Sequence, residues 1–471
     1  MSKEKELVKN TAIISVGKIC TQLVSFFLLP MYTAVLSTVE YGTVDLVITY
    51  SSLFLPFVTL ALEQALFRFL IDVRSEKEKC SKYISTTVFV SFLFTTIAFL
   101  ILLVIYFISY DALFIYFGLV LVGLTISSVS QQIARGLGDN IGYTLGSTIS
   151  AIVQIILNII FLVFFQFGAF GMMLSSFGGG IICGLILFFR CNLRQYIRFK
   201  YIDIIYLREM IRYSLPLIPN QLSWWALNAS DKVIVQLFLG VAANGIIAVA
   251  NKFSGVYIQF LNIFNISWTE SVALHIKDKD AQVFISKTVN SVYRFFLCMC
   301  CMIITIIPFV FSILINEKYN LAYDLIPIFL FASLLNVVVS LYGVIYVAYK
   351  KTVEIAKTAI YAGILNVVSH LILVKFIGIY AAGISTMIGY GVMAIYRYFH
   401  SRRYIAIRFS KQTIIYSIIL VFIAVSTYYC SNIWIHLFSL FTVLAITILI
   451  NKEMIFCILK WFKDELKHKK L

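Results

Sequence analysis

Seven charged residues lie inside long apolar stretches, where a charge is costly unless it meets a partner or water. A charged side chain at the middle of a membrane helix costs about 2.5–3.5 kcal/mol on insertion scales, so it usually faces a cavity or another helix. Lysine ammonium groups can attract phosphate as mobile point charges, and carboxylates can carry a coupled ion. The pattern therefore predicts a polar cavity built around Lys18, Asp45, Glu63, Asp231, Lys232, Lys252 and Glu270.

Polar neighbours of these charges recur at steps of three, four or seven residues, which places each series on one face of a helix. The series are Ser15, Lys18, Gln22 and Ser25; Asp45, Thr49, Ser52, Pro56, Thr59 and Glu63; Gln221, Asn228 and Asp231; and Asn251, Gly255, Gln259 and Asn262. We therefore expect a translocation cavity lined by Lys18, Gln22, Asp45, Glu63, Trp224, Asn228, Asp231, Lys232, Asn251, Lys252, Gln259 and Glu270.

Several of these residues have a purely structural alternative. Polar side chains in membrane helices often serve as interhelical hydrogen-bonding groups. Asp231 can pair with its neighbour Lys232, and Glu63 can pair with Arg68 or cap a helix. No catalytic residue and no metal site is expected, because no P-loop, H-E-x-x-H or G-x-S-x-G motif occurs and the nine cysteines are scattered.

The elements that carry these residues follow from composition. The chain has 471 residues, of which 61% are hydrophobic and 13% charged, with a mean hydropathy of +0.94. Soluble domains carry about 25% charged residues, so the composition excludes a soluble enzyme, a disordered chain and a disulfide-rich secreted module. It predicts an all-α polytopic membrane protein, since a helix needs about 20 apolar residues to cross the hydrocarbon.

Fourteen such spans are predicted, and none from the tenth onward has a charge in its interior. Their boundaries are 11–35, 42–70, 84–108, 112–134, 142–165, 169–189, 214–238, 243–271, 291–315, 323–348, 356–376, 380–399, 412–430 and 433–450.

The basic residues predict the orientation. With the N-terminus inside, 33 of the 38 lysines and arginines fall at or beside cytoplasmic segments, which is the positive-inside pattern. The net charge of +16 is therefore a topology signal and predicts no nucleic-acid partner. We expect a multi-pass protein of the cytoplasmic membrane with both termini in the cytoplasm, and its basic loops and tail against the lipid bilayer.

The chain also shows an internal repeat. Val35–Gly42 matches Phe238–Gly245 at an offset of 203, and Gln154, Asn158 and Gly171 match Asn366, His370 and Gly383 at an offset of 212. Two parallel six-helix repeats plus two extra C-terminal helices are predicted, an organisation typical of rocking transporters. The expected domains are an N-terminal lobe at 1–190, a basic cytoplasmic linker at 191–213, a C-terminal lobe at 214–399, two extra helices at 400–450 and a basic tail at 451–471.

Four stretches carry a resemblance to a known family. They are Asn10-Thr11, Glu40-Tyr41-Gly42, the segment from Tyr213-Ser214-Leu215-Pro216 to Ser230-Asp231-Lys232, and the segment from Phe376 to Gly383. On these residues the chain resembles the polysaccharide-exporter branch of the multidrug/oligosaccharidyl-lipid/polysaccharide (MOP) flippase superfamily, the O-antigen and capsule repeat-unit flippases.

The resemblance implies a flippase that moves an undecaprenyl-pyrophosphate-linked oligosaccharide for polysaccharide biosynthesis by alternating access. Lys18, Lys232 and Lys252 would then attract the pyrophosphate, and Trp224, Trp225 and Trp268 would meet sugars. No cofactor is expected beyond a coupling ion, H⁺ or Na⁺, on Asp45, Glu63 or Glu270. The expected partners are the lipid-linked oligosaccharide and the polysaccharide polymerase machinery.

Three other functions compete with this interpretation. A multidrug cation exporter of the same superfamily should have a net acidic cavity, whereas the charges here are roughly balanced and the deep ones are lysines. A lipid II flippase shares the architecture, but its cavity tends to be arginine-rich. A membrane polymerase or glycosyltransferase needs a sizeable loop or a catalytic carboxylate site, and the short loops argue against an enzyme.

Overall fold

The computed structural model describes residues 26–276, 278–349 and 351–452, and every regular element in these ranges is a helix. The predicted site residues Lys18 and Gln22 lie outside them, as do the side chains of Trp224 and Asn228. The elements in order are α2 (Leu29–Val35), α3 (Thr38–Val58), α4 (Leu62–Val73), α5 (Lys77–Ser109), α6 (Leu113–Leu137), α7 (Asn140–Ile159), η1 (Ile160–Phe164), α8 (Gly168–Arg190), η2 (Leu193–Gln195), η3 (Phe199–Tyr201), α9 (Ile204–Ser214), α10 (Leu217–Leu239), α11 (Val241–His275), α12 (Ala281–Leu314), η4 (Glu317–Tyr319), α13 (Leu321–Ala348), α14 (Thr352–Ile377), α15 (Tyr380–Ser401), α16 (Lys411–Tyr428) and α17 (Ile433–Ile450).

Eleven of these helices are long and apolar enough to cross a membrane, which confirms a polytopic membrane protein. They overlap eleven of the fourteen predicted spans. The other three predicted spans are the first, which lies mostly outside the described residues, the seventh, which contains α10, and the twelfth, which contains α15. The count of fourteen therefore stays a prediction.

The second predicted span is interrupted. The interval 42–70 was expected as one helix, but α3 ends at Val58 and α4 begins at Leu62. Leu60 and Ala61 between them have positive φ angles of 53° and 50°, which non-glycine residues adopt uncommonly. Pro56 lies in the last turn of α3, where it has no N–H and its ring disfavours a continuing helix. The expectation of one continuous helix was therefore wrong.

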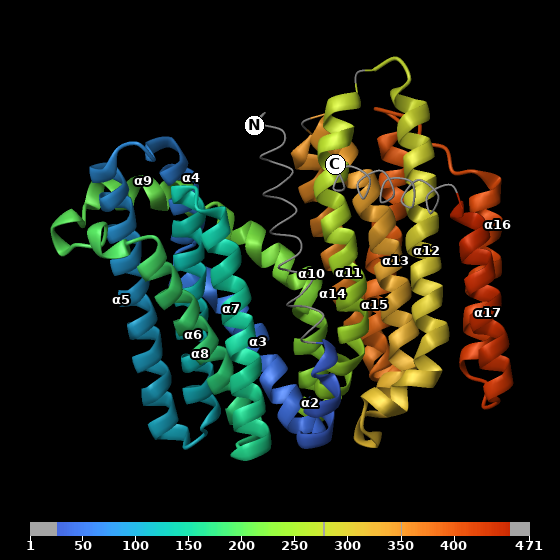
Figure 1. The fold of residues 1–471 in the computed structure, drawn as a ribbon, viewed down its shortest axis with the longest axis horizontal. Helices are drawn as coiled ribbons and strands as arrows, with labels where there is room; N and C mark the ends of the chain where they lie inside the picture. The colour runs from blue at the N-terminus through green and yellow to red at the C-terminus, as the bar shows by residue number, and fades with distance from the viewer. Residues whose placement is uncertain (1–25, 277, 350, 453–471) are drawn as a thin grey trace, which may run out of the picture. The chain divides into compact units, whose positions relative to one another are not determined.

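The chain divides into two compact units between Ala248 and Val249, inside α11. In the first unit, α5, α6, α7 and α8 stand side by side (Figure 1). A Cβ added to Gly180 of α8 would lie 2.3 Å from the carbonyl oxygen of Gly123 in α6. These two glycines therefore let the helix backbones approach closely, as small residues commonly do in membranes.

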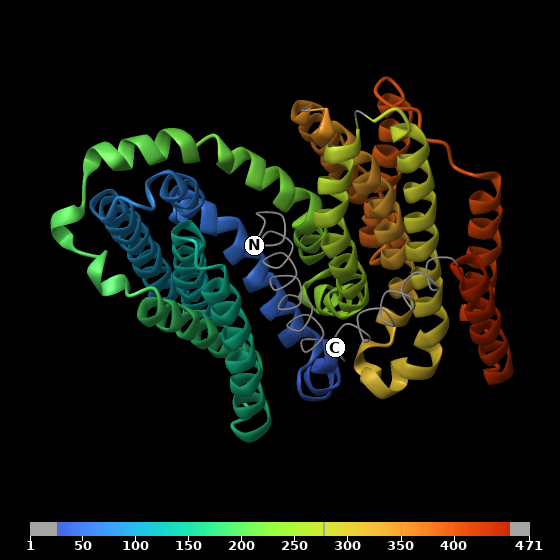
Figure 2. The same cartoon turned by 45° about the horizontal axis from the view of Figure 1, so that its top comes forward.

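An additional helix, α9, lies across one end of this unit before the chain enters α10 (Figure 2). It occupies the end of the predicted linker at 191–213. Its first turn exposes Ile204 and Ile205, while Met210 and Ser214 are buried. Asp203 caps the helix by accepting a hydrogen bond from the N–H of Ile205.

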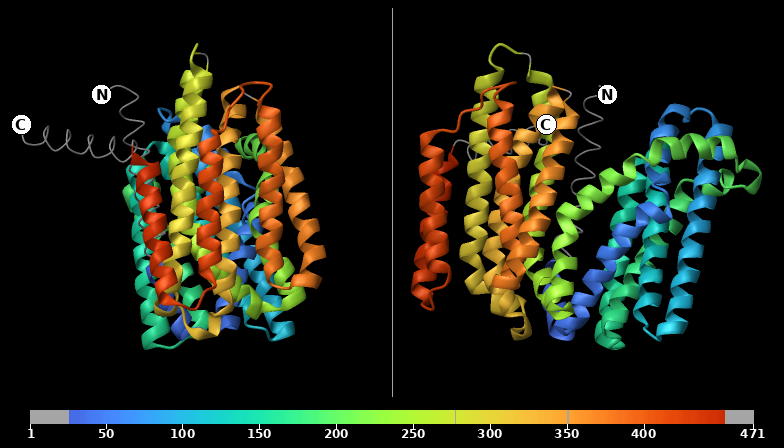
Figure 3. Two further views of the ribbon diagram at one scale, coloured as in Figure 1. Left: turned by 90° about the vertical axis from the view of Figure 1, so that its right-hand side faces the viewer. Right: turned by 180° about the vertical axis from the view of Figure 1, so that it is seen from behind.

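In the second unit, α13 and α15 pack together, as do α14 and α15. The last two helices, α16 and α17, both lie against α12 (Figure 3). Asn290 of α12 holds the start of α16, because its Oδ1 accepts from the N–H of Ser410 at 2.9 Å and from Thr413 Oγ1 at 3.0 Å.

Candidate functional site

A polar cluster forms where α3, α10 and the first turn of α11 meet, within the first unit. The Lys232 ammonium lies 2.8 Å from Asp45 Oδ1 and 3.4 Å from Thr49 Oγ1. Asn244 Nδ2 donates to the other carboxylate oxygen of Asp45 at 3.2 Å. The structure thus brings together two of the predicted site residues, Asp45 and Lys232. The Asp45 carboxylate contacts side chains from two other helices, α10 and α11.

Local sequence signals position these side chains. Ser37 and Glu40 form a reciprocal capping box at the start of α3, which satisfies two otherwise unpaired N–H groups. Asp45 and Thr49 are four residues apart in α3, so both lie on one face and reach the same lysine. The chain leaves α10 through Gly240, whose φ of 87° favours glycine, and α11 begins at once with Asn244 in its first turn.

Two glycines let α3 and α11 approach until their backbones touch. A Cβ on Gly42 would lie 2.1 Å from the carbonyl oxygen of Val241, and a Cβ on Gly245 would lie 2.0 Å from that of Thr38. Asn244 Nδ2 also donates to Gly42 O at 3.2 Å. Gly42 and Gly245 are equivalent positions of the predicted repeat, so the contact joins corresponding ends of the two matched segments.

The seam between α3 and α10 continues beyond the charge pair. Trp225 Nε1 donates to the carbonyl oxygen of Thr49 at 3.0 Å, and Tyr50 OH donates to Gln236 Oε1 at 2.7 Å. Tyr50, Gln236 and Asn244 were not among the predicted site residues. Gln236 carried a signal, because it lies four residues after Lys232 and so shares its helix face.

Asp231 contributes a second carboxylate to this part of α10. Its side chain is 8% exposed, and its Oδ1 has no hydrogen-bond partner among the described residues. Asp231 does not form the ion pair with Lys232 that the structural alternative gave it, because the Lys232 ammonium binds Asp45 instead. Adjacent helical residues point about 100° apart, so they rarely meet.

Glu63 lies apart from this cluster, in the first turn of α4. It is 4% exposed, and its Oε2 has no hydrogen-bond partner in the described part of the chain. The alternative in which Glu63 pairs with Arg68 is wrong, since Arg68 binds Asp72 at 2.6 Å. Its position near the N-terminus of α4, where the helix dipole favours a negative charge, agrees with the capping alternative.

The remaining predicted residues lie in α11 beyond Val249, in the second unit. Asn251, Lys252 and Gln259 are half-buried, whereas Glu270 is exposed. Trp268 is 2% exposed and donates from Nε1 to the carbonyl oxygen of Leu341 at 3.4 Å. A buried indole bound to backbone is a packing residue, so Trp268 does not offer a free face for sugars in this conformation.

A buried arginine was missed. Arg397 lies in α15 and is 3% exposed, although the spans from the tenth onward were expected to have no interior charge. Its guanidinium donates to Thr358 Oγ1 at 3.1 and 2.8 Å and to Val339 O at 2.9 Å. A Cβ on Gly343 would lie 2.6 Å from Arg397 Nη1. The expectation failed because Arg397 lies two residues from the predicted span end, where a basic residue usually faces the membrane surface.

Comparison with known proteins identifies the family of the chain and structures that share its fold. The family model described as "polysaccharide biosynthesis protein" matches residues 7–268. A search of curated proteins finds no match.

Solved structures share the fold at low sequence identity. The lipid II flippase MurJ in an inward closed conformation is 14% identical with a TM-score of 0.67, over 94% of this chain and 100% of that one. An inward-facing multidrug resistance transporter of the MATE family is 16% identical with a TM-score of 0.59, over 82% and 97%. A MOP superfamily transporter from Pyrococcus furiosus, described as having a binding pocket of reverse polarity, is 16% identical with a TM-score of 0.58, over 84% and 95%.

Proposed function

The chain belongs to the family of polysaccharide biosynthesis proteins, and from this premise we propose that it is a flippase for a lipid-linked oligosaccharide repeat unit. It moves an undecaprenyl-pyrophosphate-linked unit across the cytoplasmic membrane by alternating access, and hands it to polysaccharide polymerase machinery. The observation that carries the proposal is the Asp45–Lys232–Asn244 cluster, which joins α3, α10 and α11 inside apolar helices.

The charge pair is suited to release by an anionic ligand. Asp45 and Lys232 are 22% and 20% exposed, so the pair is shielded but reachable. A pyrophosphate that binds the Lys232 ammonium competes with Asp45 for it. Because a ligand shifts a conformational equilibrium only through different contacts in the two states, this competition couples substrate binding to the separation of α3 from α10.

Asp45 is also the best-placed group for a coupling ion. Once Lys232 turns to the substrate, the amide of Asn244 is the side-chain partner that the carboxylate retains among the described residues. A proton or Na⁺ bound to Asp45 would then neutralise its carboxylate charge, which Lys232 no longer balances. The prenyl tail stays in the bilayer throughout, because an apolar chain has no free-energy penalty in hydrocarbon.

Complementation of a strain that lacks its own repeat-unit flippase tests the proposal. We expect Lys232→Ala to lower polysaccharide export at least tenfold, which corresponds to about 1.4 kcal/mol, at equal membrane levels. Lys375→Ala is the matched control, because Lys375 is exposed at the end of α14. The exchange Asp45→Lys with Lys232→Asp should recover part of the export lost in each single variant. Normal export by Lys232→Ala would contradict the proposal.

Proteoliposomes separate this function from its two rivals in the superfamily. Purified full-length protein should translocate an undecaprenyl-pyrophosphate-linked oligosaccharide faster than lipid II. It should leave a cationic dye such as ethidium unmoved under either an H⁺ or a Na⁺ gradient. Preferential movement of lipid II would favour the function named for MurJ, and dye efflux would favour a multidrug exporter. Adjacent genes for glycosyltransferases and a polymerase would independently support the repeat-unit substrate.

A further inference from the structure

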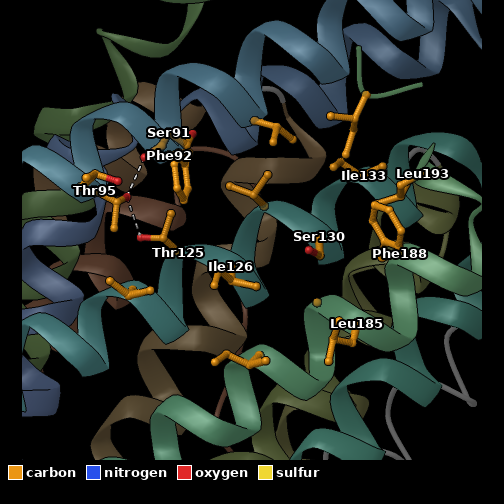
Figure 4. A pocket seen from close by; sticks show the side chains of 17 residues that line it. Ser91, Phe92, Thr95, Thr125, Ile126, Ser130, Ile133, Leu185, Phe188 and Leu193 are labelled. Atoms are coloured by element: carbon orange, nitrogen blue, oxygen red, sulfur yellow. Dashed lines mark hydrogen bonds between the residues drawn. The ribbon is translucent and has the colours of Figure 1, made fainter. Parts of the chain in front are cut away.

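A cavity lies in the first unit, between α5, α6 and α8, and its walls are mostly apolar. Its volume is about 400 Å³. The lining side chains include Val88 and Phe92 of α5, Ile126 and Ser130 of α6, and Leu185 of α8, with Leu193 closing one end (Figure 4). At its edge, Phe92 and Leu185 are 68% and 47% exposed. The cavity therefore opens on a surface of membrane-spanning helices, where its neighbour is lipid.

Two of the hydroxyl groups in the wall bind their own helix backbones, whereas the buried Oγ of Ser91 has no hydrogen-bond partner among the described residues. Thr95 Oγ1 donates to the carbonyl oxygen of Ser91 at 2.6 Å, and Thr125 Oγ1 to that of Leu121 at 2.9 Å. Because these hydroxyls are satisfied by their own helix backbones, a hydrocarbon chain entering the cavity need not break their hydrogen bonds.

A smaller and mostly apolar cavity, with one arginine in its lining, adjoins this cavity. Its volume is about 160 Å³, and it shares Val88, Phe92 and Ile197 with the larger cavity but adds Arg198. Arg194 and Lys200 flank this arginine in sequence and are exposed. Phe199, Ile204 and Ile205 beside them are 83%, 68% and 72% exposed, a mixture of basic and apolar residues that is typical of segments in the headgroup region.

The loop that carries Arg198 is firmly attached to α5. Ser85 Oγ donates to the carbonyl oxygen of Tyr196 at 2.7 Å and accepts from the N–H of Arg198 at 3.1 Å. Thr86 Oγ1 accepts from the N–H of Asp203 at 3.1 Å. The backbone of this loop, from which the Arg198 side chain extends, is therefore fixed against α5 before any ligand binds.

We propose that these two joined cavities hold one anionic phospholipid of the bilayer, with an acyl chain among α5, α6 and α8 and its phosphate at Arg198. Charge complementarity selects the headgroup, because a Lys or Arg near the membrane surface contributes about 1 kcal/mol toward an anionic lipid. The site lies in α5, α6, α8 and the 193–202 loop and shares no residue with the Asp45–Lys232 cluster. The proposed occupant is a resident lipid and not the transported one, so the inference stands whether or not the proposed function does.

Native mass spectrometry of the full-length protein in detergent tests the site. The probes are dioleoyl phosphatidylglycerol and, as the zwitterionic reference, dioleoyl phosphatidylcholine. We expect one retained phosphatidylglycerol, and we expect Arg198→Gln to lower its preference over phosphatidylcholine about fivefold. Arg208→Gln is the matched control, since Arg208 is an exposed arginine of α9 outside both cavities. An equal loss in both variants would overturn the headgroup assignment.

Filling the cavity tests the acyl chain separately. Ser130→Phe should abolish the retained lipid, and the smaller Ser130→Leu should weaken it, so that a graded loss remains measurable if the larger variant does not fold. Leu93→Phe is the control at a 43% exposed position of α5 outside the cavity. Unchanged phosphatidylglycerol binding in Ser130→Leu and Ser130→Phe would overturn the proposal. Displacement of the lipid by undecaprenyl phosphate at a lower concentration than by phosphatidylglycerol would overturn the assignment to a bilayer phospholipid.

Discussion

Two cations within the helices, Lys232 and Arg397, are bound in contrasting ways. Lys232 meets a carboxylate on another helix and is partly exposed, so its partner can be replaced by a ligand phosphate. Arg397 meets neutral oxygens of Thr358 and Val339 and is almost fully buried. A buried charge held by several fixed donors and acceptors is costly to rearrange. We therefore propose that Lys232 belongs to the transport site and that Arg397 serves the structure of the second unit.

The hydrogen bonds of Arg397 lead to a stability prediction. Arg397→Lys keeps the charge, but an ammonium cannot donate the three hydrogen bonds to Thr358 and Val339 in the same geometry. Hydrogen bonds to charged groups are worth about 1.5–3 kcal/mol each. We expect the variant to lower the melting temperature of the detergent-solubilised protein clearly. Arg403→Lys, an exposed position, should stay within about 0.5 kcal/mol of the parent protein. Equal melting temperatures for both variants would refute the assignment.

Asp139 and Arg190 form a bidentate pair that makes stability depend on pH. Arg190 Nε donates to Asp139 Oδ2 at 2.7 Å and Nη2 to Oδ1 at 3.2 Å, while the N–H of Gly142 donates to Oδ1 at 2.7 Å. Burial alone would raise the pKa of Asp139, but these hydrogen bonds and the charge of Arg190 outweigh it and hold the pKa below its ordinary value.

A carboxyl whose pKa is lowered by folding stabilises the protein above its unfolded-state pKa, about 3.9 for Asp, and loses this contribution as pH falls through the folded value. Thermal melts of the parent protein and Asp139→Asn should therefore differ at pH 7 and converge below pH of about 4. A difference that persists at the lowest pH would show that the carboxylate charge is not its cause.

The close approach of α3 and α11 belongs to the scale of helices. It depends on Gly42 and Gly245, since a Cβ at either position would collide with backbone of the other helix. A collision with backbone cannot be relieved by a side-chain rotation, so the helices must separate. That separation would also lengthen the contact of Asn244 with Asp45.

We expect Gly42→Ala to cost about 1–3 kcal/mol of stability, the usual range for overpacking, and to weaken export. Gly391→Ala is the control, because its Cβ would meet only Leu335 Cδ1 at an ordinary 3.7 Å. The melting temperature and the polysaccharide export of both variants test whether stability and transport need this close approach. If Gly42→Ala behaved like Gly391→Ala, the two helices would not need this contact.

At the scale of the whole molecule, the distribution of basic residues predicts one orientation in the membrane. Cytoplasmic reporters fused after Asp72, Arg198 and Lys467 should be active, because these positions fall in the basic segments that the positive-inside pattern retains inside. An active periplasmic reporter at the C-terminus would contradict the fourteen-span topology.

The sequence predicts those structural features that depend on interactions between residues close in the chain. Apolar length and helical periodicity are local properties, so they identified α6, α8 and most other spans within a few residues. The interruption between α3 and α4 is not marked by glycine, and its only sequence signal is Pro56. The partner of Lys232 was equally hidden, because Asp45 lies 187 residues away in the chain.

The sequence alone therefore determined that this protein is a helical membrane protein and that charged residues gather on particular helix faces. Both follow from hydrophobicity and helical periodicity, which depend only on residues close to one another in the sequence. Only the tertiary structure decided which charges meet. It joined Asp45 to Lys232 and Asn244, left Asp231 and Glu63 outside that pair, and placed Arg397 in the interior of the second unit. The physical reason is that an ion pair depends on distance in space, which helix packing sets, and not on separation along the chain.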